Sequence, residues 1–250
     1  MINQVKIAII ADIHGNSWAL EAVLEDIKKR GITNIVNLGD SLTGPLDPRG
    51  TAEILQLHKI ISIKGNQDRL ILKPTKEFLE SNTYTYVKEQ LSSDDLLWLD
   101  QQSETLSLNE EDIYLCHGTP TSDEAHLLEE VTQHGVFLRH SEEIEKDVKD
   151  IKQSVICCAH SHVPRTVYLP TGQIVLNPGS VGMPAYIDDL PYPHHMESGN
   201  PHANYVVLTK NEGQWTVEQI AVPYNWNEAA ARAIENGRDD WAKWIKLGRV

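Results

Sequence analysis

Seven polar residues each follow an apolar run of the chain, and all seven have side chains that can bind metal ions. Two runs end in pairs with i, i+2 spacing, Asp12 with His14 and His160 with His162, and three end in Asp40, Asn66 and His117. Carboxylates, imidazoles and amide oxygens suit Mn, Fe, Zn or Ni. Seven ligands are too many for one tetrahedral ion, so the pattern predicts two divalent or trivalent metal ions.

The elements before these residues predict that they meet at one place. Buried strands are favoured by the apolar runs at 5–12, 34–40, 60–64, 112–116 and 154–159. Helical patterns follow the first two runs, at 17–30 and 48–58, with Ser17 as the expected N-cap. Strand, helix, strand is typical of a parallel α/β sheet, and ligands bind at the carboxyl ends of such strands. We therefore expect the seven side chains at one sheet edge.

The later part of the chain has a different character. Residues 70–104 and the acidic segment 122–150 favour helices. Short β-like runs follow at 166–169, 173–176, 204–209 and 214–222, separated by turn residues. The tail at about 226–247 is predicted to be helical, and we interpret its tryptophans as packing residues. Because we find no repeat or flexible linker, we expect a single domain over residues 1–250.

Charge and cysteine content narrow the classes of function. Lys and Arg number 22 and Asp and Glu 36, which gives a formal net charge of −14. A chain this acidic is poorly suited to bind nucleic acid or an anionic membrane surface. We identify neither a signal peptide nor an apolar run long enough to span a membrane. The three cysteines lie in apolar runs, which indicates free thiols in a cytoplasmic protein.

The chain resembles the calcineurin-like metallophosphoesterase superfamily over residues 5 to about 180. The similar motifs are Asp12-Ile-His14-Gly-Asn, Gly39-Asp40, Gly65-Asn66-Gln-Asp68, His117-Gly118, Ala159-His160-Ser-His162 and Asn177-Pro-Gly-Ser180. The resemblance implies a four-layer α/β/β/α sandwich with a dinuclear metal centre. It further implies that one metal takes Asp12, His14, Asp40 and His162, and that the other takes Asp40, Asn66, His117 and His160. Asp40 would then bridge the two ions.

The resemblance also implies a reaction, in which a hydroxide bridging the two metals attacks phosphorus. In relatives, a His at the position of Gln67 is taken to contact the phosphate and to protonate the leaving group. An amide can donate a hydrogen bond but cannot act as an acid, so Gln67 favours good leaving groups. We therefore expect hydrolysis of phosphodiester or phosphoanhydride bonds in a small phosphorylated substrate.

Two alternatives stay open beside this expectation. The first is an enzyme specific for dinucleoside polyphosphates. The second is a non-catalytic, metal-binding scaffold of the same fold, against which the retention of all seven ligand positions argues. The sequence does not predict the oligomeric state.

Other residues near the motifs are candidates for binding substrate. Asn16 opens the first helix, whose backbone N–H groups attract anions, and Arg69 carries a guanidinium that can hold phosphate bidentately. Residues 181–203 hold four prolines and several aromatic residues, and we expect a loop that covers the site. We hypothesise that His194, His195 or His202 supplies the missing acid, the alternative being a surface loop or subunit contact.

Overall fold

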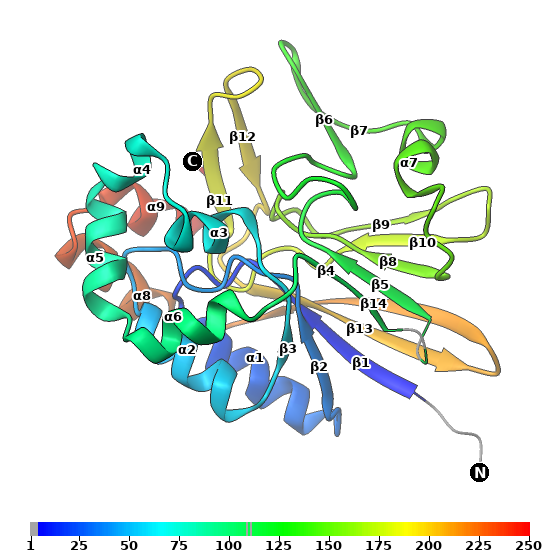
Figure 1. Ribbon diagram of the computed structural model, residues 1–250, viewed down its shortest axis with the longest axis horizontal. Coiled ribbons are helices and arrows are strands. Elements are labelled where there is room, and N and C mark those ends of the chain that lie inside the picture. The colour runs from blue at the N-terminus through cyan, green and yellow to red at the C-terminus, as the bar shows by residue number, and fades with distance from the viewer. Residues whose placement is uncertain (1–4, 109, 111) are drawn as a thin grey trace.

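Two five-stranded β-sheets pack face to face in the computed structural model, which describes residues 5–108, 110 and 112–250 (Figure 1). The first sheet has the order β14 (Gln214–Val222), β13 (Ala203–Asn211), β1 (Val5–Ile10), β2 (Asn34–Asn37) and β3 (Ile61–Ser62). The second has the order β4 (Thr105–Leu108), β5 (Ile113–Cys116), β8 (Val155–Cys157), β10 (Ile174–Asn177) and β9 (Arg165–Tyr168). β1, β2 and β3 are parallel to one another, as the strand–helix–strand order predicts, and β5, β8 and β10 are parallel in the second sheet. The other pairs, including β1 with β13, are antiparallel.

β1 illustrates how the apolar runs build these layers. Successive side chains of a strand point to opposite faces of the sheet. Ile7 and Ile9 join the core between the two sheets, whereas Ala8 and Ile10 pack on the other face against α1 (Ser17–Lys29). Both faces of β1 are therefore buried, which explains why its sequence is almost continuously apolar.

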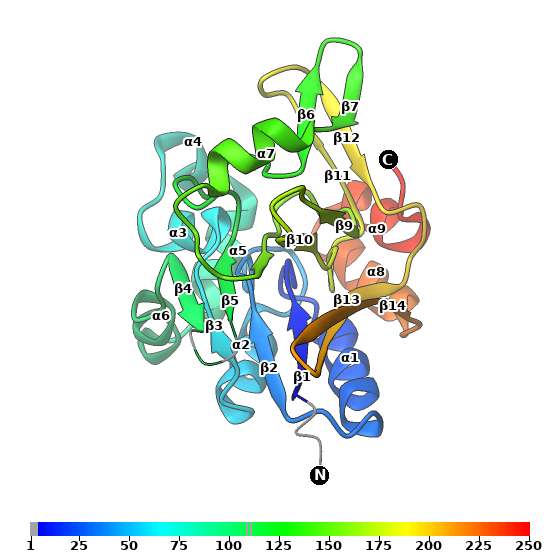
Figure 2. The ribbon, with the colours of Figure 1, turned by 90° about the vertical axis from the view of Figure 1, so that its right-hand side faces the viewer.

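Helices cover the outer face of each sheet. α1 packs on the first sheet together with α2 (Pro48–Leu57), and α7 (Ser141–Val148) packs on the second through Ile144 and Val148 (Figure 2). The fold is therefore the four-layer α/β/β/α sandwich that the sequence predicts.

The start of α1 corrects one expectation. Asn16 rather than Ser17 is the N-cap, and its side-chain oxygen accepts a hydrogen bond from the Ala19 N–H at 3.1 Å. Ser17 is the first helical residue and its hydroxyl donates to Asp47, the N-cap of α2, at 2.7 Å. The hydroxyl is thus used between two helix ends and not within one.

The prediction of a helix across 122–150 is wrong for most of its length. Residues 129–138 form a hairpin of β6 (Glu129–Thr132) and β7 (Gly135–Leu138), and only α7 is helical. Gly135 has a φ of 128°, which lies outside the helical region. β-branched residues such as Val131 and Val136 also favour strands over helices.

Part of segment 181–203 is regular as well, where an irregular loop was expected. β11 (Ala185–Asp188) and β12 (His194–Glu197) form an antiparallel hairpin. β12 contacts β7, so the two hairpins lie side by side above the sandwich (Figures 1 and 2). Two of the four prolines, Pro191 and Pro193, lie at the tip between the two strands, and Pro184 and Pro201 flank the hairpin.

The predicted helical segment after β3 is present as α3 (Asn66–Leu72), α4 (Lys76–Leu79), α5 (Asn82–Gln90) and α6 (Ser93–Asp100). Edge strand β4, which follows it, was not predicted.

Residues 226–247 form α8 (Trp226–Glu235) and α9 (Asp239–Leu247), with Gly237 between them at a φ of 71°. Among all residues that the structure describes, no helix is both long and apolar enough to cross a membrane.

Candidate metal centre

The seven predicted ligands meet where the carboxyl ends of strands from both sheets converge. Asp12, His14, Asp40 and Asn66 come from the loops after β1, β2 and β3 of the first sheet, and His117, His160 and His162 from those after β5 and β8 of the second. Six of these side chains are buried and His160 is partly buried. The site is therefore assembled only when the two sheets pack together.

Six of the residues form two adjacent groups, Asp12 with His14 and His162, and Asp40 with His117 and His160. The ligand atoms within each group lie no more than 4.8 Å from one another. The Nε2 atoms of His14 and His162 are 3.2 Å apart. Two nitrogens about 2.1 Å from one tetrahedral ion would be separated by about 3.4 Å, so this pair has the spacing of ligands to one ion.

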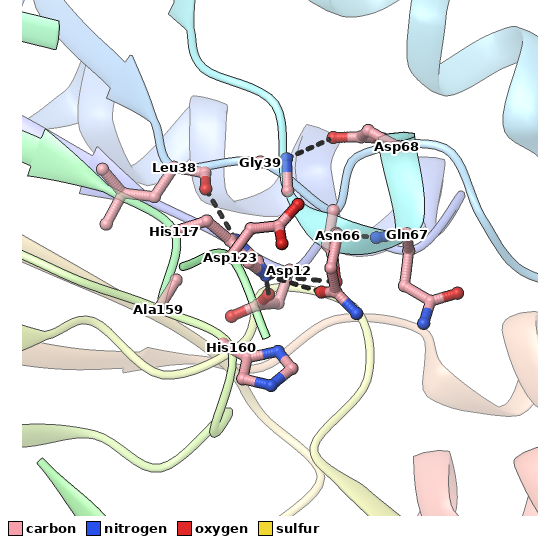
Figure 3. A network of polar contacts seen from close by, with 12 residues as sticks. Asp12, Leu38, Gly39, Asn66, Gln67, Asp68, His117, Asp123, Ala159 and His160 are labelled. Atoms are coloured by element: carbon pink, nitrogen blue, oxygen red, sulfur yellow. Dashed lines mark hydrogen bonds and ion pairs between the residues drawn. The ribbon is translucent and has the colours of Figure 1, made fainter. Parts of the chain in front are cut away.

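Asp40 belongs to the second group but also faces the first. Asn66 lies beside the second group. Asp40 Oδ2 is 3.3 Å from His117 Nε2 and 3.9 Å from His14 Nε2, so this carboxylate faces both groups. Asn66 Oδ1 is 3.1 Å from His117 Nε2 (Figure 3). Asp40 is therefore close to ligand atoms of both groups, and Asn66 is close to the second group.

Hydrogen bonds orient three of the imidazoles toward the centre. The Nδ1 atoms of His14, His117 and His162 contact the backbone oxygens of Thr43, Leu38 and Met183 at 2.9, 2.8 and 2.7 Å, respectively. A ring that donates from Nδ1 carries its lone pair on Nε2 when neutral, which is the form that binds a metal. The backbone therefore selects the ligating tautomer and the ring direction.

Glycine allows the loops of Asp40 and Asn66 to approach closely. Gly39 has a φ of 97°, and a Cβ atom there would lie 2.3 Å from the Gly65 nitrogen. A Cβ atom on Gly65 would lie 2.1 Å from Asp40 Oδ1. The Gly-Asp and Gly-Asn pairs in the sequence thus reflect direct packing of one loop against the other.

Five of the seven ligands have a left-handed backbone conformation. Values of φ between 52° and 69° occur at Asp12, His14, Asp40, His160 and His162. Residues other than glycine adopt this region at an energetic cost, and such strain concentrates at functional sites. Neighbouring contacts hold the strained loops, as where the Asp12 and His14 N–H groups donate to the oxygens of Gly39 and Asp40, both at 3.0 Å.

The electrostatics of the site suit cations. Both side-chain oxygens of Asp12 are buried and have no hydrogen-bond partner among the described residues, and burial raises the pKa of Asp12 well above its usual value. Burial opposes charge on His117 too, but the charge of Asp40 outweighs this effect and raises the pKa of His117 to about 10. Burial lowers the pKa of His14 and His162. A buried carboxyl group that lacks hydrogen-bond donors among the described residues, beside His14 and His162, which burial keeps neutral, fits a cation-binding site.

Asp68 belongs to the Gly65-Asn66-Gln-Asp68 motif, but the sequence predicted no function for it. Its side chain binds the backbone of two loops that carry candidate ligands. Its carboxylate accepts hydrogen bonds from the backbone N–H groups of Ser41 and Gly65, at 3.0 and 3.2 Å. Burial, followed by the nearby charge of Asp40, raises the pKa of Asp68 to about 7. Asp68 therefore joins the two loops that carry Asp40 and Asn66.

The residues predicted to bind substrate have diverse environments. Asn16 is buried, and its amide donates to the Gly182 oxygen at 2.9 Å in addition to capping α1. Arg69 makes two hydrogen bonds to Asp123 and one to Glu124, so its guanidinium is engaged by carboxylates rather than free for phosphate. Gln67 lies at the site, and Figure 3 shows its side chain extending away from the ligand cluster.

The three loop histidines are also separated by the fold. His194 is buried, and its Nδ1 contacts the Tyr192 oxygen at 2.8 Å. His195 is exposed, and His202 packs on Trp226 with ring centroids 5.7 Å apart. None of the three lines the cavity that contains the ligands, so the structure does not support them as the replacement acid.

The sequence analysis did not predict that two further side chains, His126 and Tyr186, lie next to the candidate ligands. His126 stacks on His160 with ring centroids 4.7 Å apart, and its Nε2 is 3.3 Å from the Tyr186 hydroxyl. That hydroxyl donates to the His160 backbone oxygen at 3.1 Å. Burial lowers the pKa of His126 to about 3. His126 lies in the acidic segment 122–150 that was predicted to be helical, where no motif distinguishes it.

Two cavities meet at the metal ligands. One, of about 350 Å³, is lined by His14, Asp40, Gln67, Tyr186 and residues of α4, α5 and α9. The other, of about 690 Å³, lies between the hairpins and is lined by Glu124, His126, Glu130, Arg139 and others. Asn66, His160 and Asp188 line both cavities. The candidate centre therefore has a cavity on each side. We call the cavity of about 350 Å³ the aromatic arm and the cavity of about 690 Å³ the acidic arm.

Comparisons with known proteins agree with this architecture. Residues 5–192 match the model of the calcineurin-like phosphoesterase superfamily domain. The chain is 28% identical over 272 residues to an uncharacterized protein of Methanocaldococcus jannaschii, covering 97% of this chain and 98% of that protein.

Solved structures show the same fold. A metallophosphoesterase from Sphaerobacter thermophilus superposes with a TM-score of 0.75 at 21% identity, covering 98% of this chain and all of the other. A hypothetical protein from Pyrococcus horikoshii OT3 gives 0.74 at 19% identity, with 97% and 98% covered. The ligand motifs, the sandwich and the family match together show that the chain belongs to the calcineurin-like phosphoesterase superfamily.

Proposed function

We propose that the protein hydrolyses phosphodiester or phosphoanhydride bonds with two metal ions. One ion would be bound by Asp12, His14 and His162. The other would be bound by His117, His160 and Asn66. Asp40 would bind both ions. When bound, such a pair lowers the pKa of water, which supplies a nucleophile near neutral pH, and neutralises charge on the phosphate oxygens.

The observation that carries this proposal is the pair of arms that meet at His160 and Asn66. A phosphomonoester has one substituent on phosphorus, whereas a diester or anhydride has one on each side of the bond that breaks. A phosphorus atom at the ligands would have room for a substituent in each arm. The fold of a metallophosphoesterase adds support but does not by itself assign a substrate.

The residues around the ligands would position the substrate and hold the ions. Among the described residues, the Gln67 side-chain amide has no protein partner, so it is free to donate to a phosphate or leaving-group oxygen. His126 and Tyr186 hold the His160 loop. With no acid at Gln67, we infer that good leaving groups react fastest.

Charge favours a small substrate over a polymer. The acidic arm carries Glu124, Glu129, Glu130 and Asp188, and the whole chain has a formal net charge of −14. A nucleic acid or a long polyphosphate would be repelled. This argues against the alternative of a dinucleoside polyphosphate, whose several phosphates would have to enter one arm. Three buried free cysteines agree with a cytoplasmic location.

The test is hydrolysis by protein that is first stripped with a chelator and then reloaded with Mn²⁺, Fe²⁺, Ni²⁺, Zn²⁺ or Mg²⁺. An aryl phosphomonoester, an aryl phosphodiester and a dinucleoside polyphosphate would be compared. We expect metal-dependent turnover that favours the diester, is abolished in Asp40→Asn and is retained in Asp150→Asn, which replaces an exposed aspartate. Absence of metal binding would overturn the metal centre, and tight metal binding with no turnover would favour the scaffold alternative.

A further inference from the structure

The aromatic arm has a wall of large rings that the metal centre does not require. Phe78 of α4, Tyr186 of β11, and Trp241 and Trp244 of α9 line it, together with Met183 and Ile187. The same cavity reaches His14 and Asp40 at its inner end. α9 lies beyond residues 5–192, the part of the chain that matches the family model. Trp241 and Trp244 therefore lie outside the part of the chain that carries the shared motifs.

The rings of this wall are held in place by other side chains. Trp241 packs edge-on to His14 with ring centroids 5.9 Å apart and lies 6.4 Å from Trp244. Phe78 packs edge-on to Tyr84 at 5.4 Å. A flat apolar surface that is already ordered binds a flat ligand with little loss of conformational entropy.

The charge in the arm excludes a second phosphate. Among the described residues, Arg238 is the one Lys or Arg that lines the arm. The Arg238 guanidinium makes two hydrogen bonds to Asp240, at 2.9 and 2.7 Å, and one to Thr83 at 2.8 Å. The Arg238 guanidinium also lies 5.3 Å from the ring centroid of Trp241. These partners leave Arg238 little capacity for a further anion. The substituent that enters the arm should be uncharged, planar and largely apolar.

We propose that the aromatic arm binds the base of a nucleotide, so that the substrates of this site are nucleotide phosphoesters. This inference rests on the proposed phosphoesterase function. A base has an apolar face for stacking and polar edges, and the free Gln67 amide lies in the same cavity. The cavity of about 350 Å³ is within the range of small-molecule sites, which suits one nucleoside rather than an oligonucleotide.

Two matched ligand pairs test the proposal. The first pair is the 2,2,2-trifluoroethyl phosphodiester of adenosine 5′-phosphate and the same diester of 1-O-methylribose 5-phosphate, which share the reacting phosphorus and a good, non-aromatic leaving group and differ in the base. The second pair is adenosine 5′-phosphate and ribose 5-phosphate, whose binding to metal-loaded protein is measured by calorimetry. Base stacking predicts at least about tenfold higher kcat/KM and about tenfold tighter binding for the adenosine compounds.

Two variants test whether the preference for a base arises in the aromatic arm. Phe78→Leu should reduce several-fold the ratio of kcat/KM and the ratio of binding affinity between the adenosine and ribose compounds. Phe137→Leu is the matched control, because Phe137 is the only other phenylalanine, is 52% exposed and lies on β7 outside the arm. Thermal unfolding and metal content would verify that each variant is folded and loaded.

The outcomes separate this inference from the proposed function. Hydrolysis of both diesters with ratios near one, or a ratio unaffected by Phe78→Leu, would overturn the base-binding arm and leave the phosphoesterase intact. A base preference in binding without any hydrolysis of either diester would support the arm and count against the proposed reaction. Neither binding preference nor hydrolysis would overturn both.

Discussion

At the scale of single residues, the site contains ionisable side chains whose burial lowers the stability of the folded state. Asp12 is fully buried and its carboxylate oxygens have no hydrogen-bond partner within the described part of the chain. Such a group destabilises the protein unless a cation neutralises it. The sequence can show that Asp12 is present, but its isolation from other donors follows only from the packing.

Replacing Asp12 should therefore separate stability from metal binding. We expect Asp12→Asn to lower metal affinity by at least about 100-fold, since even residues that only support ligands are worth 10- to 100-fold. The metal-free variant should be as stable as the metal-free wild type, or more stable, because a buried carboxyl group for which the described residues provide no hydrogen-bond donor is removed. Metal titration by calorimetry and thermal unfolding with chelator would measure the two effects. A metal-free variant that unfolds at much lower temperature would contradict this account.

Asp26 at the end of α1 gives a pH prediction away from the metal centre. Its carboxylate accepts hydrogen bonds from the buried Tyr205 hydroxyl at 2.6 Å and from Arg30 at 2.7 Å. Burial works in the opposite direction, but these partners together lower the pKa of Asp26. A carboxyl with a lowered pKa stabilises the folded state above the unfolded pKa of about 3.9, and this contribution is lost as pH falls through the folded value.

We therefore expect Asp26→Asn to cost about 1 kcal/mol of unfolding free energy at pH 6. The difference from wild type should shrink below about pH 4, where Asp26 becomes protonated. Urea unfolding at pH 6, 4 and 3 would measure it, with the exposed Glu21→Gln of the same helix as control. A difference that stays constant across this range would contradict the assignment.

At the scale of elements, the loops after β2 and β3 act as one unit. Gly39 and Gly65 pack against each other, and Asp68 bonds to the backbone of both loops. The two glycines mark this contact in the sequence, but a Gly-Asp or Gly-Asn pair is too short to show which loop it meets.

We expect Gly65→Ala to displace Asp40, because the added Cβ atom would lie 2.1 Å from Asp40 Oδ1 and 2.6 Å from its backbone nitrogen. Metal affinity and turnover should fall at least about tenfold, as for loss of a supporting contact. Gly172→Ala is the control, since it adds strain at a φ of 88° in open space far from the centre and should cost stability only. Equal metal affinity in the two variants would contradict direct packing.

At the scale of the whole molecule, the metal centre connects the two sheets. The loops of β1, β2 and β3 supply part of the ligands and those of β5 and β8 the rest. Metal that binds only when both sheets are in place must stabilise the complete sandwich.

A saturating metal ion should therefore raise the unfolding temperature. At 100 times the dissociation constant, one ion adds about 2.7 kcal/mol, which corresponds to a rise of roughly 5–11 °C for a chain of this size. Differential scanning calorimetry with and without Mn²⁺ would measure the rise. A chelator should reverse it and Asp40→Asn should abolish it. An unchanged unfolding temperature under saturating metal would count against ligands shared between the sheets.

The sequence alone determined which residues are candidate metal ligands and which strands present them. Ligand type and position at strand ends are local properties, because an apolar run followed by Asp, His or Asn is visible within a few residues. The period-two burial of β1 likewise follows from its own side chains. This is why the parallel strands and the seven candidate ligands could be predicted from the residues, whereas the four layers were implied by the resemblance to the superfamily.

Only the tertiary structure decided what surrounds the centre. The hairpins at 129–138 and 185–197 were misjudged, since their strands are stabilised by pairing and packing rather than by local preference. Trp241 packs among the tail helices, as the sequence predicts, but it also contacts His14 near the opposite end of the chain. Contacts between residues so distant in sequence leave no periodic signal. The arms that would select a substrate depend on such contacts, whereas the metal ligands do not.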